Sequence, residues 1–180
     1  MKQSKSQNLK SKKKNKPTQF IKNWLRKFVE VPHPAFADMP PCPYARQARM
    51  QDKIKFMEIN TAFPEVNIYL EISKFDFDNN DVLVMILPAD DLTVKQTQST
   101  AITLNKQFRK SDIVVLEDHP QIKEQVQSVK LNNGQYILFL AQRLSKLNKA
   151  SSALKRTGYY KNWTKQYFDH VVTSRDPQSS

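Results

Sequence analysis

The hydrophobic pattern begins at Thr18 and first indicates a helix. Large apolar side chains recur there at helical spacing, with polar ones opposite: Phe20, Ile21, Trp24, Leu25, Phe28 and Val29 form the apolar stripe. Such a helix packs on a core. It must end before Pro32, because proline disfavours the α conformation in the residue ahead of it.

Prolines dominate the next segment. Residues 32–43 hold five of the ten prolines, so this segment neither pairs in a sheet nor continues a helix. A short helix over 44–50 and a strand over 53–59 are expected to follow. Residues 65–73 fit both the strand and the helix period, and the preceding Pro64 favours the helix.

Two continuous apolar runs, 82–87 and 113–116, predict strands that are buried on both faces. The segment between them has helical spacing through Phe108, and Asp90 or Asp91 is its expected N-terminal cap. Strand, helix and strand in this order predict two strands that run in the same direction.

The last third of the chain predicts a hairpin and two helices. Asn133-Gly134 separates the apolar stretches 126–131 and 136–140, which is a strong hairpin signal. An apolar face over 140–154 predicts one helix, with Gly158 as its C-terminal cap, and a stripe over 160–171 predicts a second.

Together these elements predict a single mixed α/β domain over residues 18–175. The expected architecture is a two-layer mixed sheet of about four or five strands covered by helices, and a ferredoxin-like arrangement is one form of it. Residues 1–17 are expected to be a disordered lysine-rich tail and residues 176–180 a disordered C-terminus. Neither segment has enough apolar surface to offset the entropy cost of ordering it.

Composition narrows the class of protein. No apolar run approaches the ~20 residues that cross a bilayer, and no apolar segment of a secretory signal accompanies the first lysines. A cytoplasmic protein without membrane insertion is therefore expected. Only two glycines occur, which excludes a Gly-rich phosphate loop, and a single cysteine excludes an intrachain disulfide.

The net charge of +12 is unevenly distributed. Seven lysines lie in the first 16 residues with no acid among them, residues 58–91 are strongly acidic, and residues 141–168 carry bases but no acid. The folded domain is thus expected to have a basic end and an acidic stretch.

Two segments hold the residue types that carry chemistry. His33 and Cys42 lie in the proline-rich segment, and Glu117, Asp118 and His119 follow the second buried strand, where α/β sheets place ligands. If the segments converge, His33, Cys42 and His119 would form a three-ligand site for a divalent metal. Cys42 would alternatively be a nucleophile whose thiolate is favoured by His119, with Glu117 or Asp118 orienting the ring.

These residues also have a purely structural interpretation, in which Cys42 is a small buried hydrophobe and both histidines satisfy the backbone of turns. The leading functional hypothesis is a Cys42/His119 pocket that binds a metal or a small anionic ligand, as in a hydrolase or transferase.

The basic C-terminal block suggests an alternative function. Its residues could follow the phosphates of a nucleic acid or another polyanion, together with the N-terminal tail: Arg143, Lys155, Arg156, Lys161 and Lys165. A related hypothesis is that the same tail and C-terminal helices bind a partner protein. The interleaved aromatic residues share an apolar stripe, which favours a place in the core over stacking on bases.

The chain resembles a group of bacterial proteins of unknown function. The resemblance is carried by the aromatic-rich helix over 24–29, by Cys42-Pro43-Tyr44-Ala45 and by Asp118-His119-Pro120. That group has Cys-Pro-Phe-Ala-like and Phe-His-Pro-like motifs, and this chain departs from them at Tyr44 and Asp118. The resemblance implies that Cys42 and His119 belong to one site, and it implies no particular reaction.

Overall fold

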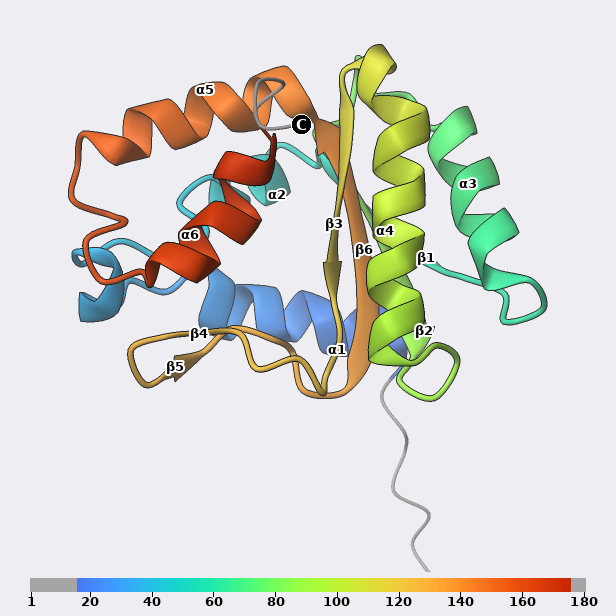
Figure 1. Ribbon diagram of the computed structural model, residues 1–180, viewed down its shortest axis with the longest axis horizontal. Coiled ribbons are helices and arrows are strands. Elements are labelled where there is room, and N and C mark those ends of the chain that lie inside the picture. Colours follow the sequence, from blue (N-terminus) through green and yellow to red (C-terminus); the bar gives the residue numbers. More distant parts are fainter. Residues whose placement is uncertain (1–15, 176–180) are drawn as a thin grey trace, which may run out of the picture.

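The computed structural model describes residues 16–175 (Figure 1). The helices are α1 (Pro17–Trp24), α2 (Ala45–Met50), α3 (Pro64–Lys74), α4 (Val94–Phe108), α5 (Leu144–Lys155) and α6 (Lys165–Val171). A π-helix, η1 (Leu25–Val29), continues α1, and the short 3-10 helices are η2 (Pro34–Phe36), η3 (Arg109–Ser111) and η4 (Thr173–Arg175). The strands are β1 (Ile54–Glu58), β2 (Val82–Pro88), β3 (Ile113–Asp118), β4 (Gln125–Val126), β5 (Val129–Lys130) and β6 (Tyr136–Arg143).

The main sheet has four strands in the order β1-β2-β6-β3. β1 and β2 are parallel, and β6 is antiparallel to both of its neighbours. β2 and β3 therefore run in the same direction, as predicted, but β6 lies between them. β3 is left at the edge of the sheet, and this edge becomes the centre of the candidate site.

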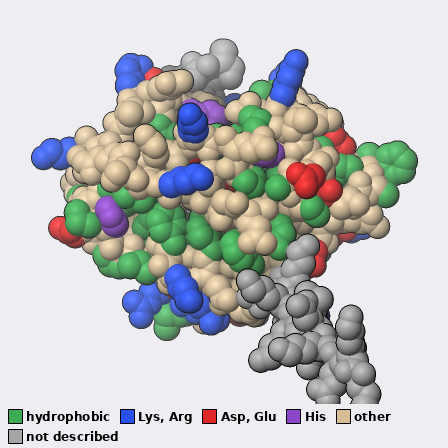
Figure 2. Space-filling view, turned by 90° about the horizontal axis from the view of Figure 1, so that it is seen from below, with side chains coloured by type: hydrophobic (Ala, Val, Ile, Leu, Met, Phe, Trp, Pro, Cys, Tyr) green, Lys and Arg blue, Asp and Glu red, His purple; other side chains and the backbone are tan. Residues whose placement is uncertain are grey.

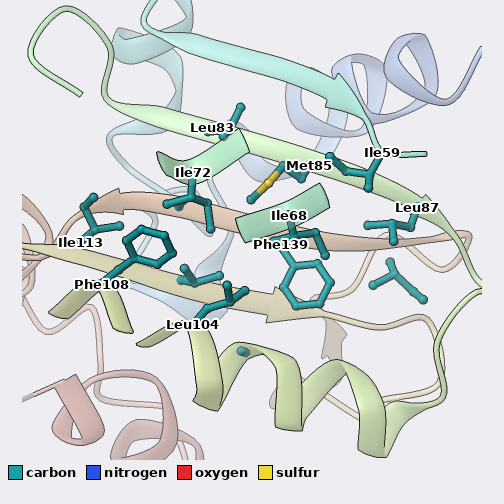
Figure 3. Packing of buried hydrophobic residues seen from close by; sticks show 14 of the residues in the cluster. Ile59, Ile68, Ile72, Leu83, Met85, Leu87, Leu104, Phe108, Ile113 and Phe139 are labelled. Atoms are coloured by element: carbon teal, nitrogen blue, oxygen red, sulfur yellow. The ribbon is translucent and has the colours of Figure 1, made fainter. Parts of the chain in front are cut away.

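Helices cover both faces of the sheet, so the fold is mixed α/β as expected but has three layers where two were predicted. One face of β2, with Leu83, Met85 and Leu87, packs under α3 and α4 (Figure 3). The alternate residues Val84 and Ile86 face α1, η1 and α2. Because successive side chains of a strand point to opposite faces, an apolar run of this kind needs a helical layer on each side.

The order of elements also differs from the ferredoxin-like alternative. A ferredoxin-like domain runs β-α-β-β-α-β, whereas here β1, α3, β2, α4 and β3 precede β6. Two helical crossovers come first, and the antiparallel strand is added last.

A third apolar cluster joins the C-terminal helices to the rest of the molecule. It contains Phe36 from η2, Val126 from β4, Leu154 from α5 and Tyr159 from the turn after α5. Tyr167 of α6 packs against the same cluster. The aromatic residues of the C-terminal third thus belong to packing, as the sequence pattern favoured, and they hold α6 beside β3.

The predicted hairpin around Asn133-Gly134 is wrong. Residues 136–143 form β6 and pair with β2 and β3, and the small β4-β5 hairpin closes on itself. The Asn133 side chain explains the difference, because its Oδ1 accepts hydrogen bonds from the N–H groups of Gln135 (3.0 Å) and Tyr136 (2.7 Å) and thereby shapes a longer loop.

Three helix boundaries also differ from expectation. Thr93, not Asp90 or Asp91, caps α4 through a reciprocal capping box with Gln96. β6 continues to Arg143, so α5 begins at Leu144. The residues from Tyr160 to Trp163 form turns, and α6 begins only at Lys165, after the Thr164 cap.

Within residues 16–175, every helix is too short or too polar to cross a membrane. The expected tails fall outside this range except for Lys16 and Pro17, and Pro17 is already the first residue of α1, a position that suits proline.

Candidate functional site

A cavity of about 860 Å³ is lined by residues of the free edge of β3, of α4 and of α6. Figure 1 shows these two helices on either side of β3. Ligand pockets commonly have this size and combine apolar walls with a few polar groups. The walls here are mainly apolar, and the residues that line them include Leu116 of β3, Leu138 and Leu140 of β6, Ile102 of α4 and Val171 of α6. Charged side chains are gathered toward its ends.

A side chain of α4 satisfies part of the free hydrogen-bonding edge of β3. The side-chain Nδ2 of Asn105 donates to the carbonyl oxygen of Val115 (2.8 Å), and its Oδ1 accepts from the Val115 N–H (2.8 Å). An unpaired edge would offer these groups to another strand. With Val115 already satisfied, the cavity is better suited to a ligand than to an added strand at this point.

The end of the cavity at the C-terminus of β3 is acidic. Glu117, Asp118 and Glu124 all line it. Asp118 is 8% exposed, and its Oδ2 accepts hydrogen bonds from the backbone N–H (3.2 Å) and the side-chain Nδ2 (2.9 Å) of Asn133. Its Oδ1 is buried and has no hydrogen-bond partner among the residues that the structure describes.

Burial dominates the titration of this acidic group. It raises the pKa of Asp118 to about 6, although the hydrogen bonds from Asn133 pull in the other direction. It raises the pKa of Glu124 to about 7, with the nearby charges of Asp118 and Glu117 adding to the effect. The pKa of Glu117 is raised as well, again mainly by burial. Carboxyl groups of this kind hold a proton near neutral pH or attract a cation once ionised.

α6 places two further polar side chains over the acidic end. His170 lines the cavity, with its Nε2 4.0 Å from Oε1 of Glu117. Tyr167 also lines it, and burial followed by the charges of Glu124 and Asp118 raises the pKa of its phenol. Tyr167 therefore stays neutral at ordinary pH and is available as a hydrogen-bond donor.

Asn133, in the loop before β6, fixes the position of Asp118 at the acidic end of the cavity. Besides its two bonds to Asp118, it donates through Nδ2 to the Tyr136 carbonyl oxygen (2.7 Å). The loop that carries Asn133 is thereby fastened to the start of β6. The Asn-Gly pair, which predicted a hairpin, lies instead in a loop whose Asn133 positions Asp118.

His119 belongs to the structure of the loop and not to the cavity. It is 1% exposed, its Nδ1 accepts from the Gln121 N–H (3.1 Å), and its Nε2 lies 3.0 Å from the Leu92 carbonyl oxygen. Since Nδ1 accepts, Nε2 carries the proton and donates to Leu92. Both ring nitrogens are occupied, so His119 has no lone pair left for a metal or for Cys42.

His33 has a similar structural role at the surface. It is exposed, and its Nδ1 accepts from the Ala35 N–H (3.1 Å) to cap η2. The structural interpretation of both histidines, as residues that satisfy turn backbones, is thus confirmed.

Cys42 is exposed and not the buried hydrophobe of that interpretation. Its backbone N–H donates to Val29 (3.1 Å), while protein atoms crowded around the thiol raise its pKa, an effect that N–H groups of Tyr44 and Ala45 only partly offset. Raised in this way, the pKa disfavours the thiolate that a nucleophile needs.

The predicted metal triad is not assembled. Residues 16–175 contain no group of three or more His, Cys, Asp or Glu side chains placed to hold a metal ion. Cys42 and His119 also have different neighbours, because Cys42 bonds to Val29 whereas His119 bonds to Leu92 and Gln121. Of the predicted catalytic residues, the cavity brings together Glu117 and Asp118 only.

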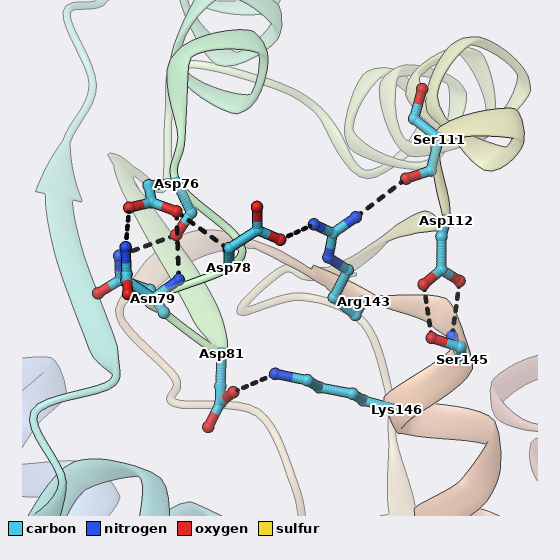
Figure 4. A network of polar contacts seen from close by, with 10 residues as sticks. Asp76, Asp78, Asn79, Asp81, Ser111, Asp112, Arg143, Ser145 and Lys146 are labelled. Atoms are coloured by element: carbon cyan, nitrogen blue, oxygen red, sulfur yellow. Dashed lines mark hydrogen bonds and ion pairs between the residues drawn. The ribbon is translucent and has the colours of Figure 1, made fainter.

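The predicted nucleic-acid residues are divided between the two ends of α5, roughly 18 Å apart at the helical rise. Arg143 forms an ion pair with Asp78 (2.6 Å) and Lys146 one with Asp81 (2.9 Å), in a network that binds the end of β6 to the 76–81 turn (Figure 4). Their charges are used within the fold.

At the other end of α5, Lys155 lies over the Phe168 ring, and Lys165 pairs with Asp169. Arg156 and Lys161 are exposed. Figure 2 shows lysine and arginine side chains scattered among other residues on the face that it presents, without one continuous basic patch. The geometry favours the cavity over this block as a functional site.

Sequence reasoning missed Glu124, Tyr167 and His170 as site residues. Glu124 lies in a polar stretch without periodicity, and the two α6 residues read as parts of an apolar stripe and a helix surface. These three residues become part of the site only because the fold places them beside the edge of β3. No local sequence pattern predicts that position.

Comparison with known proteins finds no match to this chain among protein-family models, curated proteins or solved structures. The resemblance to the bacterial group with Cys-Pro-Phe-Ala-like motifs therefore rests on those short motifs alone.

Proposed function

We propose that this protein binds a small organic cation, with a primary ammonium or guanidinium group at the acidic end of the β3 cavity and an apolar body along its walls. The observation that carries the proposal is the buried Oδ1 of Asp118, which has no partner in the described chain although Asp118 lines the cavity. A buried carboxylate oxygen without a hydrogen bond costs free energy, and a cationic donor would remove that cost.

The electrostatics around Asp118 support a cation over a neutral ligand. Besides burial, the charge of Glu117 raises the pKa of Asp118, and the charges of Asp118 and Glu117 raise the pKa of Glu124. The basic side chain paired with this group is His170, whose Nε2 lies 4.0 Å from Oε1 of Glu117. A full positive charge placed among them would lower all three pKa values toward their ordinary range. The free energy of that shift would contribute to binding.

The roles of the surrounding residues follow from their positions. Asp118 and Glu124 would accept the hydrogen bonds of the cationic group, and Asn133 would keep Asp118 oriented. Tyr167 and His170 would close the site from α6. Leu116, Leu138 and Leu140 would contact the apolar body.

The test uses the full chain and hexylammonium as the probe, with hexanol as its neutral counterpart, in calorimetric titrations at pH 5 to 8. We expect hexylammonium to bind more tightly than hexanol and its affinity to increase with pH, because Asp118 and Glu124 ionise near pH 6 and pH 7 while an alkylammonium stays charged. Asp118→Asn should weaken binding about tenfold, which corresponds to about 1.4 kcal/mol.

A matched control is Glu65→Gln, because Glu65 is an exposed acid on α3 that does not line this cavity. It should leave the affinity unchanged. Equal binding of hexanol and hexylammonium, or an Asp118→Asn variant with the affinity of the original protein, would contradict the proposal.

A further inference from the structure

The end of the cavity away from the acidic group is basic. Lys106, Arg109 and Arg175 line it, near the N-terminal end of β3. Lys106 of α4 and Arg109 of η3 are close in sequence, whereas Arg175 of η4 comes from the far end of the described chain. No carboxylate within residues 16–175 forms an ion pair with any of the three.

Arg175 is the central residue of this end. It is 5% exposed, its Nη2 donates to Oγ of Ser151 (3.1 Å), and its carbonyl oxygen accepts from Nη2 of Arg109 (2.7 Å). Its Nε and Nη1 are buried and have no hydrogen-bond partner in the described part of the chain. Two of the three guanidinium nitrogens are therefore unsatisfied.

A buried guanidinium without hydrogen-bond partners costs free energy of folding unless an anion or acceptor pairs with it. A guanidinium remains charged at all physiological pH values, so it cannot relieve its burial by losing a proton as a carboxylate relieves it by gaining one. A buried charged side chain is normally paired with a group of opposite charge. Within residues 16–175 no carboxylate supplies such a pair, and the side chain lines a cavity large enough to admit a ligand.

We propose that Arg175, Arg109 and Lys106 form an anion subsite, which takes the carboxylate or phosphate group of the same ligand whose cationic group lies at Asp118. Arg175 supplies the buried donors, and Arg109 and Lys106 add positive charge at the rim. This inference rests on the proposed function, since it makes the ligand dipolar: a cation at one end, an anion at the other and an apolar segment between them.

The length of the ligand follows from the strand. β3 extends from Ile113 to Asp118, which at about 3.4 Å per residue separates the two charged ends by roughly 17 Å. An extended ω-amino acid of about twelve carbons, or a short peptide with apolar side chains and free termini, has charges at such a separation. A compact amino acid does not.

The test uses the full chain and three probes in parallel titrations: 12-aminododecanoate, 6-aminohexanoate and hexanoate. We expect 12-aminododecanoate to bind at least tenfold more tightly than 6-aminohexanoate, which is too short to reach both ends. Arg175→Gln should lower the affinity for 12-aminododecanoate about tenfold and abolish binding of hexanoate, because both probes lose the anion contact. Lys106→Gln, at an exposed position where folding is not at risk, should lower both affinities to a smaller extent.

The matched control is Lys110→Gln. Lys110 is an exposed base in η3 next to Arg109 and does not line the cavity, so its replacement should leave all three affinities unchanged. If Lys110→Gln weakens binding as much as Lys106→Gln does, the effect is one of general charge and the subsite is refuted.

The same titrations separate the two proposals. If Asp118→Asn lowers the affinity for 12-aminododecanoate while Arg175→Gln and Lys106→Gln do not, the anion subsite is refuted and the cation site stands. If the Arg175 and Lys106 variants lower it while Asp118→Asn does not, the cation site is refuted and the basic end is an anion site by itself.

Discussion

Asn105 of α4 hydrogen-bonds both backbone groups of Val115 on the free edge of β3. A single side-chain amide thereby takes the place of a neighbouring strand. The same contact holds α4 against the wall of the cavity, which connects the stability of the sheet edge to the shape of the site.

Asn105→Ala should lower the free energy of unfolding by about 1–3 kcal/mol, because it leaves the N–H and carbonyl oxygen of Val115 unpaired. Chemical denaturation measures the change. Gln107→Ala, an exposed position on the same helix, serves as the control and should change the stability by less than about 0.5 kcal/mol. Equal effects of the two substitutions would show that the Val115 contact contributes nothing.

Stability should fall as pH rises from about 4 to about 7. Asp118 and Glu124 have pKa values of about 6 and about 7 in the folded protein, above those of an unfolded chain, so the native state binds more protons in this window. The ionisation of Asp118 accounts for about 3 kcal/mol of this decrease at most. Denaturation curves across this range should show the decrease.

Asp118→Asn removes one ionisation and should flatten that decrease, whereas Glu65→Gln should leave it intact. A stability that rises over the same range in the original protein would mean that these carboxyl groups are ionised without penalty.

His119→Ala should destabilise the fold by about 2–4 kcal/mol, since it leaves the Gln121 N–H and the Leu92 carbonyl oxygen without partners and opens a cavity. His170→Ala, at an exposed position, should cost less than about 0.5 kcal/mol. In the original protein, the imidazole nitrogen resonances of His119 should identify the tautomer protonated at Nε2. A His119→Ala variant of full stability would restore the case for a functional imidazole.

Cys42 should react with iodoacetamide more slowly than the thiol of glutathione at pH 7.5, because the raised pKa lowers its thiolate fraction. The difference should disappear in denaturant, and Cys42→Ser should remain folded. Faster alkylation than glutathione in the native state would instead indicate an activated nucleophile.

Much of the fold was predictable from local pattern. The amphipathic helix from Thr18, the strands within 82–88 and 113–118 and the helix between them were all expected, since each depends on the spacing of apolar residues within one segment. The common direction of β2 and β3 followed from their connection. The insertion of β6 between them did not, because pairing of strands is decided by contacts between distant segments.

The candidate site divides in the same way. Glu117 and Asp118 were expected at the tip of a buried strand, and both line the cavity. His119 was expected beside them and is instead turned into the loop by its two hydrogen bonds. Adjacent residues of a strand end point in different directions, and sequence proximity does not say which of them faces a cavity.

By itself, the sequence determined the mixed α/β class, the type of most of its elements and the acidic end of β3, because these depend on short-range periodicity and on residue type. Only the tertiary structure decided the three layers, the edge position of β3 and the meeting of Asp118, Glu124, Tyr167 and Arg175 around one cavity. Burial in a shared low-dielectric space raises the pKa values of Asp118, Glu124 and Tyr167. It also leaves Oδ1 of Asp118 and two guanidinium nitrogens of Arg175 without partners among residues 16–175.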